Sequence, residues 1–196
     1  MADFKTKVLL FLLVSFLCSS ICGEVVNYPK SIQLTENSTL PFRNYAVFAP
    51  ASFSLYSIGL YVAGSETDNM KLKNADEPMA IELVSLYRYL KMRKLISELK
   101  RGFSYGMSHD KEFLKTIEKE INSFVKMLES GGNPAKYSII TFLYIPNEGT
   151  HVSFNKKYLG TVPGLDFKKA LFGIWLNDNC ADNKLREQII KPEKEK

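Results

Sequence analysis

The spacing of hydrophobic residues changes three times along the chain, and the order of these changes constrains the fold more than any other feature. Runs rich in aromatic and β-branched residues come first, and such runs are typical of strands. Apolar residues at helical spacing follow, then a second group of strand-like runs, then helical spacing again. Two groups of strands with helices between and after them predict an α+β domain, with an antiparallel β-sheet packed on one face by several helices.

The expected elements can be placed by residue number. Strands are expected at residues 31–34, 40–49, 53–63, 79–89, 137–144, 150–154 and 158–162. Helices are expected at residues 92–103, 110–130, 166–176 and 181–190. Residues 64–78 are polar and charged, which indicates a surface loop, and Gly102 is a plausible helix stop. Because the run at 137–144 is almost continuously apolar, we expect it to be a central strand.

The first 23 residues have the three parts of a cleavable secretory signal. Lys5 and Lys7 supply a positive start, residues 8–17 form an uncharged apolar core, and Gly23 is a small residue at the expected cleavage point. A core of about ten residues is too short to cross a membrane as a helix, which takes ~20 residues. We therefore expect an exported protein (secreted, periplasmic or in the lumen of the secretory pathway) with no membrane span after signal removal.

The remaining chain is expected to form one domain at residues 24–190, followed by a charged, disordered tail at 191–196. Two of the three cysteines leave with the signal, so Cys180 cannot form an intramolecular disulfide and the core alone must stabilise the domain. Cys180 could pair between chains or act as a nucleophile. His109 and His151, however, have no spacing that indicates a catalytic triad or a metal site, so we expect Cys180 to have no chemical role and the domain to need no cofactor.

The basic residues are interleaved with acids, and the whole chain has a formal net charge of +5. The densest cluster is formed by Lys91, Arg93, Lys94, Lys100 and Arg101. Nucleic acid could bind there, but cations spaced along an expected helix are also typical of a solvated helix face, and we expect no nucleic-acid partner. The chain has no glycine-rich phosphate loop, no nucleophile elbow and no metal-ligand cluster, so the common signatures of catalysis are missing.

A dense group of aromatic residues follows Arg43. Its members are Tyr45, Phe48, Phe53, Tyr56 and Tyr61. An arginine beside an aromatic sheet face can pair with a carboxylate at the mouth of an apolar cavity, because the guanidinium is a bidentate donor and a tyrosine hydroxyl can add a third bond. The alternative is that Arg43 is a surface residue and that the aromatic residues are ordinary core.

The segment 53–62, Phe-Ser-Leu-Tyr-Ser-Ile-Gly-Leu-Tyr-Val, resembles the signature strand of the chalcone isomerase-like family, which follows an arginine and a loop. Two later features agree with this resemblance. A strand runs into a basic amphipathic helix that ends at 101–103, and the closing helix ends in Ile174, Trp175 and Leu176. The resemblance covers about residues 35–190 and implies an open-faced sandwich of an antiparallel sheet and helices.

The family contains isomerases and fatty-acid-binding proteins. In the binding proteins an arginine and a strand tyrosine grip the carboxylate, and Arg43 and Tyr56 match these two positions. The helix tyrosine and asparagine of the isomerases fall on Met92 and Leu99, which cannot orient a flavonoid. The resemblance therefore implies that the chain binds a fatty acid or other small apolar carboxylate without catalysis. The alternatives are a chalcone isomerase-type intramolecular lyase and a secreted interaction module without a cavity.

Overall fold

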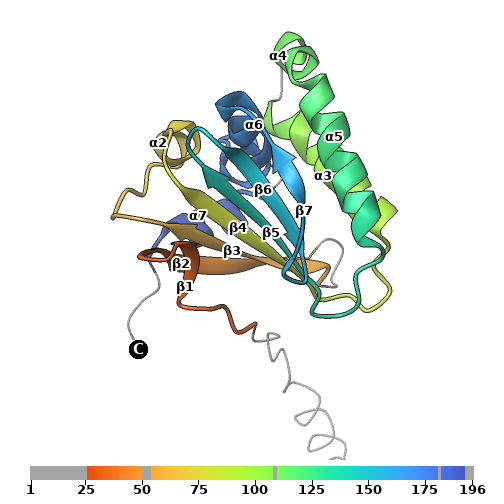
Figure 1. The fold of residues 1–196 in the computed structure, drawn as a ribbon, viewed down its shortest axis with the longest axis horizontal. Helices are drawn as coiled ribbons and strands as arrows, with labels where there is room; N and C mark the ends of the chain where they lie inside the picture. The colour runs from red at the N-terminus through yellow and green to blue at the C-terminus, as the bar shows by residue number, and fades with distance from the viewer. Residues whose placement is uncertain (1–25, 50–53, 108–109, 181, 193–196) are drawn as a thin grey trace, which may run out of the picture.

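The computed structural model describes residues 26–49, 54–107, 110–180 and 182–192 of the 196. The expected signal at residues 1–23 lies outside these ranges, and so does most of the charged tail. The described residues form a curled antiparallel sheet with helices on one side (Figure 1). This confirms the α+β class, with an antiparallel sheet packed on one face by helices.

Seven strands make up the sheet, and each pairs antiparallel with the next one along the chain. They are β1 (Ser31–Thr35), β2 (Ser38–Phe48), β3 (Tyr56–Val62), β4 (Met79–Ser85), β5 (Ile139–Ile145), β6 (Gly149–Phe154) and β7 (Lys157–Val162). The order is that of a meander, in which neighbours in sequence are neighbours in space. Most of the helical residues are inserted between β4 and β5.

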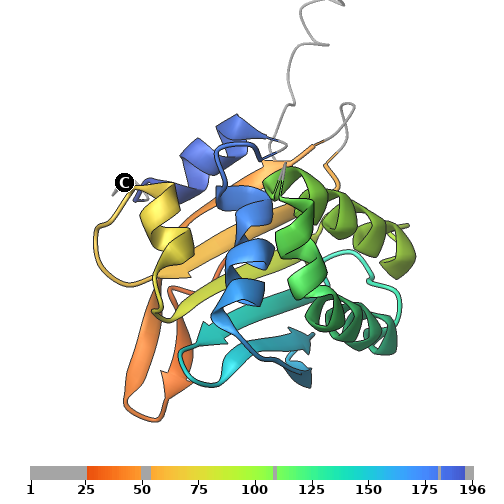
Figure 2. The same ribbon diagram turned by 90° about the horizontal axis from the view of Figure 1, so that it is seen from above.

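The helices of the described residues gather on one face of the sheet (Figure 2). They are α2 (Asn69–Asn74), α3 (Met92–Gly106), α4 (Lys111–Thr116), α5 (Glu118–Gly131), α6 (Leu165–Leu176) and α7 (Asn183–Ile190). The helix α6 crosses the middle of the sheet, and α3 packs beside it. The helix α5 covers β6 and β7, while α7 covers β2 and β3.

The main core lies between the sheet and these helices and is rich in aromatic rings. Phe124 contacts Phe142 at 5.5 Å and Phe103 at 6.2 Å between ring centroids, and Phe142 stacks on Trp175 at 6.3 Å. All four side chains are buried. Since the described part of the chain has no disulfide, burial of such large rings, each worth about 2–3 kcal/mol, is the main stabilising term.

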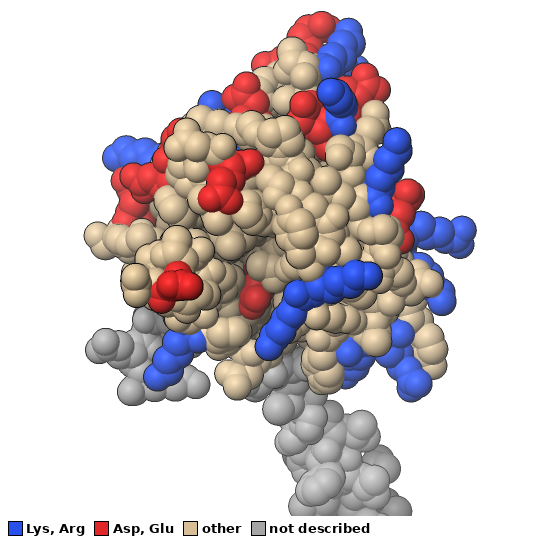
Figure 3. All heavy atoms as spheres, in the orientation of Figure 1, with Lys and Arg blue, Asp and Glu red and all other residues tan. Residues whose placement is uncertain are grey.

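A second, smaller core lies on the opposite face of the sheet. Residues 26–30 and β1 cover it, and its members include Tyr28, Leu40 and Tyr61. The aromatic residues after Arg43 are divided between the two faces, because successive strand side chains point to opposite sides. Tyr56 packs on the helix face, whereas Tyr45 packs on the other. Beyond this cluster, the uncovered face of the sheet carries few charged side chains (Figure 3).

Burial on both faces explains which strand is central. Every residue of β3 and β4 is buried, and β4 is the fourth of seven strands. The strand β5, which we expected to be central, alternates between buried and half-buried residues. It does lie inside the sheet, between β4 and β6, but the second core extends mainly under β2, β3 and β4 and leaves one face of β5 less covered.

Three local expectations also need correction. The expected loop at 64–78 contains the helix α2, which Asp68 caps by accepting bonds from two backbone N–H groups. The expected single helix at 110–130 is two helices, separated at the buried Ile117. Gly102 does not stop a helix but lies inside α3, where a Cβ atom would meet Ile174 of α6 at 2.5 Å. Glycine at this position lets α3 and α6 pack closely.

Candidate functional site

A cavity of ≈ 60 Å³ lies where the first residue of β3 meets helices α3, α6 and α7. Its walls are mainly apolar, and they include Phe48, Ile174, Trp175 and Leu185. The helix α3 contributes the polar rim through Glu98 and Arg101. An apolar interior with a few polar groups at its mouth is typical of small-molecule sites.

Tyr56 is the polar group inside this cavity. Its ring stacks on Phe48 at 5.0 Å between centroids, and its hydroxyl accepts a hydrogen bond from Trp175 Nε1 at 3.4 Å. Burial raises the pKa of Tyr56 to about 12, so the hydroxyl stays protonated at physiological pH. Among the described residues, no acceptor lies within hydrogen-bond distance of that proton. The hydroxyl can therefore donate to a ligand.

Three charged side chains line the cavity: the cation Arg101 and the carboxylates of Glu98 and Asp182. Glu98 is mostly buried and pairs with two cations, Lys94 at 2.6 Å and Arg101 at 3.1 Å. One carboxylate thus faces two positive charges, and the Arg101 side chain is 61% exposed. Asp182 also lines the cavity, but its carboxylate caps α7 by accepting from the backbone N–H of Leu185. Arg101 is therefore the one charged group of the described lining that can contact an anion.

Cys180 lines the same cavity. Its Sγ atom lies 3.4 Å from the backbone oxygen of Asp182. Burial raises the pKa of the Cys180 thiol, and a protonated thiol is a poor nucleophile. The structure therefore gives this cysteine no activating partner among the described residues.

Arg43 has a different environment. It lies at an irregularity in β2 and is only 5% exposed. Its guanidinium donates to three backbone oxygens: Gly64 at 2.6 Å, Glu66 at 2.8 Å and Ile190 at 3.1 Å. Burial lowers its pKa, and the charge of Glu66 opposes this shift. Arg43 thus ties the end of α7 and the chain after β3 to the sheet, because it satisfies carbonyls that have no partner in a regular element.

The structure does not bring Arg43 and Tyr56 together. Tyr56 pairs with Phe48 across the sheet, whereas Arg43 lies at the other end of the same strand pair, beside Asn44. At ~3.3 Å per residue, the five steps from Arg43 to Phe48 span about 16 Å along the strand. Tyr56 lines the cavity and Arg43 does not. Contact between either side chain and a ligand stays a prediction.

Sequence reasoning did not identify Trp175, which lies beside Tyr56, or Arg101, which lies on the rim of the cavity, as candidate site residues. Trp175 belongs to the segment that resembled the family, but its position over Tyr56 depends on how α6 crosses the sheet. Arg101 belongs to the basic cluster, which we interpreted as a solvated helix face. Met92 and Leu99 are buried in the core, at 4% and 2% exposed, so neither provides a polar group.

Two further polar side chains are buried away from the cavity. Lys168 is fully buried and donates to the backbone oxygens of Leu72, Lys73 and Ala75 at the end of α2. Burial lowers its pKa to about 8. Glu82, on the opposite face of the sheet, accepts bonds from Tyr61 and Thr141, and burial raises its pKa. Both groups have protein partners, which indicates a structural role.

Neither a metal-binding cluster nor a membrane-spanning helix is found among the described residues. No group of three or more His, Cys, Asp or Glu side chains among them could hold a metal ion. Within the same ranges, no helix combines the length and the apolar character needed to cross a membrane.

Comparison with known proteins identifies relatives of this fold. A family model described as chalcone isomerase-like matches residues 23–190. Among solved structures, the fatty-acid binding protein AtFAP1 of Arabidopsis thaliana is similar, with a TM-score of 0.62 and 15% sequence identity. The match covers 83% of this chain and 90% of that one. No curated protein sequence matches the chain.

Proposed function

Because the chain belongs to the chalcone isomerase-like family, we propose that it binds a fatty acid or a similar apolar carboxylate without catalysing a reaction on it. The observation that carries this proposal is the apolar cavity with one neutral, buried hydroxyl and a largely exposed arginine at its mouth. The similarity of the fold to a fatty-acid binding protein supports it.

Tyr56 and Arg101 are the groups we propose for the carboxylate. A carboxylate that enters an apolar site loses its hydration, and charge-assisted hydrogen bonds must offset that cost. Tyr56 supplies an O–H donor, and Arg101 supplies a guanidinium whose present partner, Glu98, also holds Lys94. The ligand carboxylate would therefore compete with Glu98 for Arg101, while Lys94 remains to balance Glu98.

The size of the cavity limits how the acyl chain can enter. A volume of ≈ 60 Å³ is far below the ~300–1,000 Å³ that is typical of ligand pockets. The apolar side chains of α6 and α7 that line the cavity would have to separate from α3 to admit a long chain. We therefore propose that the polar end is held at Tyr56 and Arg101 and that the chain extends between the helices.

A titration with a fluorescent fatty acid tests this proposal. We expect Arg101→Gln to weaken binding about 10-fold and Tyr56→Phe about 5-fold, as each removes one hydrogen bond to a charged group. Lys119→Gln, an equal loss of charge on exposed α5, serves as the control and should leave binding unchanged. Equal affinity in all four proteins, or no saturable binding by the wild type, would contradict the proposal.

An isomerase is the alternative in the same family. The same protein can be mixed with a chalcone, whose cyclisation we expect at the uncatalysed rate because buried, apolar Met92 and Leu99 occupy the two positions where the resemblance places the polar pair of the isomerases. Saturable acceleration that is lost in Tyr56→Phe would favour the enzyme instead.

Export is part of the proposal and rests on the sequence of residues 1–23 alone. N-terminal sequencing of protein recovered from outside the producing cell should begin near Glu24. Recovery of a membrane-bound form that still carries Met1 would contradict it.

A further inference from the structure

One surface of the molecule concentrates positive charge and exposed tyrosine. It consists of the outer face of α3 and the turn before it, and we call it the α3 surface. Its cations are Arg88, Lys91, Arg93, Lys94, Lys100 and Arg101, and Glu98 is its carboxylate. These six cations and one acid give a formal charge equal to the +5 of the whole chain.

The α3 surface is continuous with the binding cavity. A groove of ≈ 470 Å³ lies between Tyr89 and the start of α3, and a second groove of ≈ 450 Å³ follows along the helix. Arg93 lines both grooves, while Arg101 lines both the second groove and the binding cavity. The mouth of the cavity therefore opens beside these cations.

The cations of this surface are under-compensated. Lys91 and Arg93 lie at the start of α3, where the helix dipole is positive and where no acidic residue lies in the first turn. Among the described residues, Lys91, Arg93 and Lys100 have no ion-pair partner, and Lys94 shares Glu98 with Arg101. Glu129 of α5 also lines the second groove, so two carboxylates face these cations. Such an arrangement destabilises the isolated protein slightly, and it favours an anionic partner that covers several cations at once.

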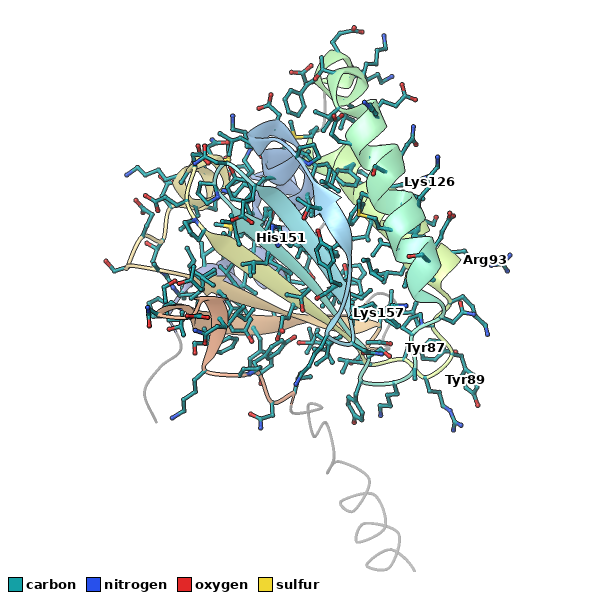
Figure 4. All side chains as sticks on the ribbon, in the orientation of Figure 1. Tyr87, Tyr89, Arg93, Lys126, His151 and Lys157 are labelled. Atoms are coloured by element: carbon teal, nitrogen blue, oxygen red, sulfur yellow. The ribbon has the colours of Figure 1, made fainter. Side chains whose placement is uncertain are left out.

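Two exposed tyrosines stand at the end of the same surface. Tyr89 is 63% exposed and Tyr87 is 40% exposed, and their rings meet edge to face at 5.8 Å between centroids. The Arg88 guanidinium lies 4.9 Å from the centroid of the Tyr89 ring. Figure 4 shows both tyrosines and Arg93 at one corner of the molecule. Rings with a polar tip, placed next to cations, suit the headgroup region of a bilayer.

We propose that the α3 surface docks the protein on an anionic phospholipid bilayer, with the mouth of the cavity turned toward the lipid. We favour a bilayer over a nucleic acid because this surface continues into the apolar cavity through Arg101, and an apolar cavity suits an acyl chain better than a base. This choice of partner rests on the proposed function. Docking would depend on charge and exposed rings, and not on whether the cavity holds a fatty acid.

Vesicle flotation with the full mature chain tests the proposal without any added fatty acid. The probes are vesicles of pure phosphatidylcholine and vesicles of phosphatidylcholine with about 30% phosphatidylserine, an anionic lipid. We expect binding only to the anionic vesicles, and weaker binding as salt rises. The triple variant Lys91→Gln, Arg93→Gln, Lys100→Gln should bind about 100-fold less, at roughly fivefold per cation.

Matched variants separate this surface from charge in general. Lys111→Gln, Lys115→Gln, Lys119→Gln removes three exposed cations of α4 and α5 and should keep most of the binding. Tyr89→Ser should weaken binding while leaving its salt dependence unchanged, because the ring carries no charge. Circular dichroism confirms that each variant is folded.

Three results would overturn the proposal. The first is equal binding to neutral and anionic vesicles. The second is an equal loss in the two triple variants. The third is tighter binding to a single-stranded oligonucleotide than to anionic vesicles at the same salt concentration, which would assign the surface to nucleic acid. Fatty-acid affinity measured on the same variants is a separate readout, so failure of docking and failure of ligand binding can be told apart.

Discussion

The two ends of β3 show opposite ways of burying a tyrosine. At one end Tyr61 donates to Glu82 at 2.9 Å within a small, filled core. At the other end Tyr56 accepts a long bond from Trp175, keeps a proton without an acceptor among the described residues, and lines a cavity. A polar group whose bonds are complete stabilises a fold, whereas a buried donor with spare capacity beside empty space can bind a ligand.

The Tyr61 end of β3 also lies near Arg43, the cation that the sequence suggested for ligand binding. Arg43 and Lys168 both hold the connection between β3 and β4: Arg43 bonds to Gly64 and Glu66, and Lys168 bonds to the end of α2. Their donors are directed at backbone oxygens that the connection leaves without partners. The predictions below test whether these two cations are structural and whether the cavity end alone binds.

The largest effect is expected for Arg43→Met. Loss of three charge-assisted bonds should lower the free energy of unfolding by about 4 kcal/mol, measured by urea denaturation. The affinity of the folded variant for a fluorescent fatty acid should change less than about 3-fold. Arg43→Lys keeps the charge with fewer donors, so its free energy of unfolding should lie between those of the wild type and Arg43→Met. Unchanged stability with a loss of affinity of about 100-fold would instead support the ligand contact that the family resemblance implied.

A pH series tests Lys168. Its pKa in the folded protein, about 8, lies below the ordinary 10.5. Between these values the unfolded chain binds more protons, so the free energy of unfolding should rise with pH, by about 2–3 kcal/mol from pH 7 to pH 10. Above pH 10 the rise should reverse, because the pKa of buried Tyr56 is raised to about 12 and unfolding then releases protons. Urea midpoints provide the measurement. The variant Lys168→Met should lose most of the rise, and an equal rise in this variant would assign it to other groups.

The smallest effects come from a matched pair, Tyr61→Phe and Tyr56→Phe. Tyr61→Phe leaves Glu82 with one donor fewer and should cost about 2 kcal/mol of stability with no change in ligand affinity. Tyr56→Phe should cost less than about 1 kcal/mol of stability but weaken fatty-acid binding about 5-fold. If both substitutions affected stability and affinity to the same extent, the contrast between the two ends of β3 would not hold.

Hydrophobic periodicity predicted the fold class, the antiparallel sheet and most of the elements, because these depend on local spacing. It failed where a distant contact decides the outcome. Gly102 is a possible helix stop in sequence, yet the approach of Ile174 from α6 makes it a packing position inside α3. The split at Ile117 and the helix α2 were missed for a similar reason, since each depends on packing or on a cap that a polar or apolar pattern does not report.

The candidate site was less predictable than the fold. Tyr56 was identified from the resemblance, and the structure places it in the cavity wall. The acceptors of Arg43 lie 21, 23 and 147 residues away in sequence, so no local pattern could show that its donors are occupied. Arg101 was visible as a cation, but only the position of α3 beside β3 and α6 makes it part of a rim.

The small volume of the cavity has a kinetic consequence. An acyl chain cannot enter a space of ≈ 60 Å³ until the lining helices part, so opening precedes or limits uptake. The observed association rate should then level off at high ligand concentration, at the rate of helix opening, instead of rising linearly toward the diffusion limit. Under the proposed function, the apparent affinity should likewise fall in proportion to the fraction of molecules that are open. Substitutions that loosen the contact between α3 and α6 would therefore speed uptake and tighten apparent binding without touching the carboxylate.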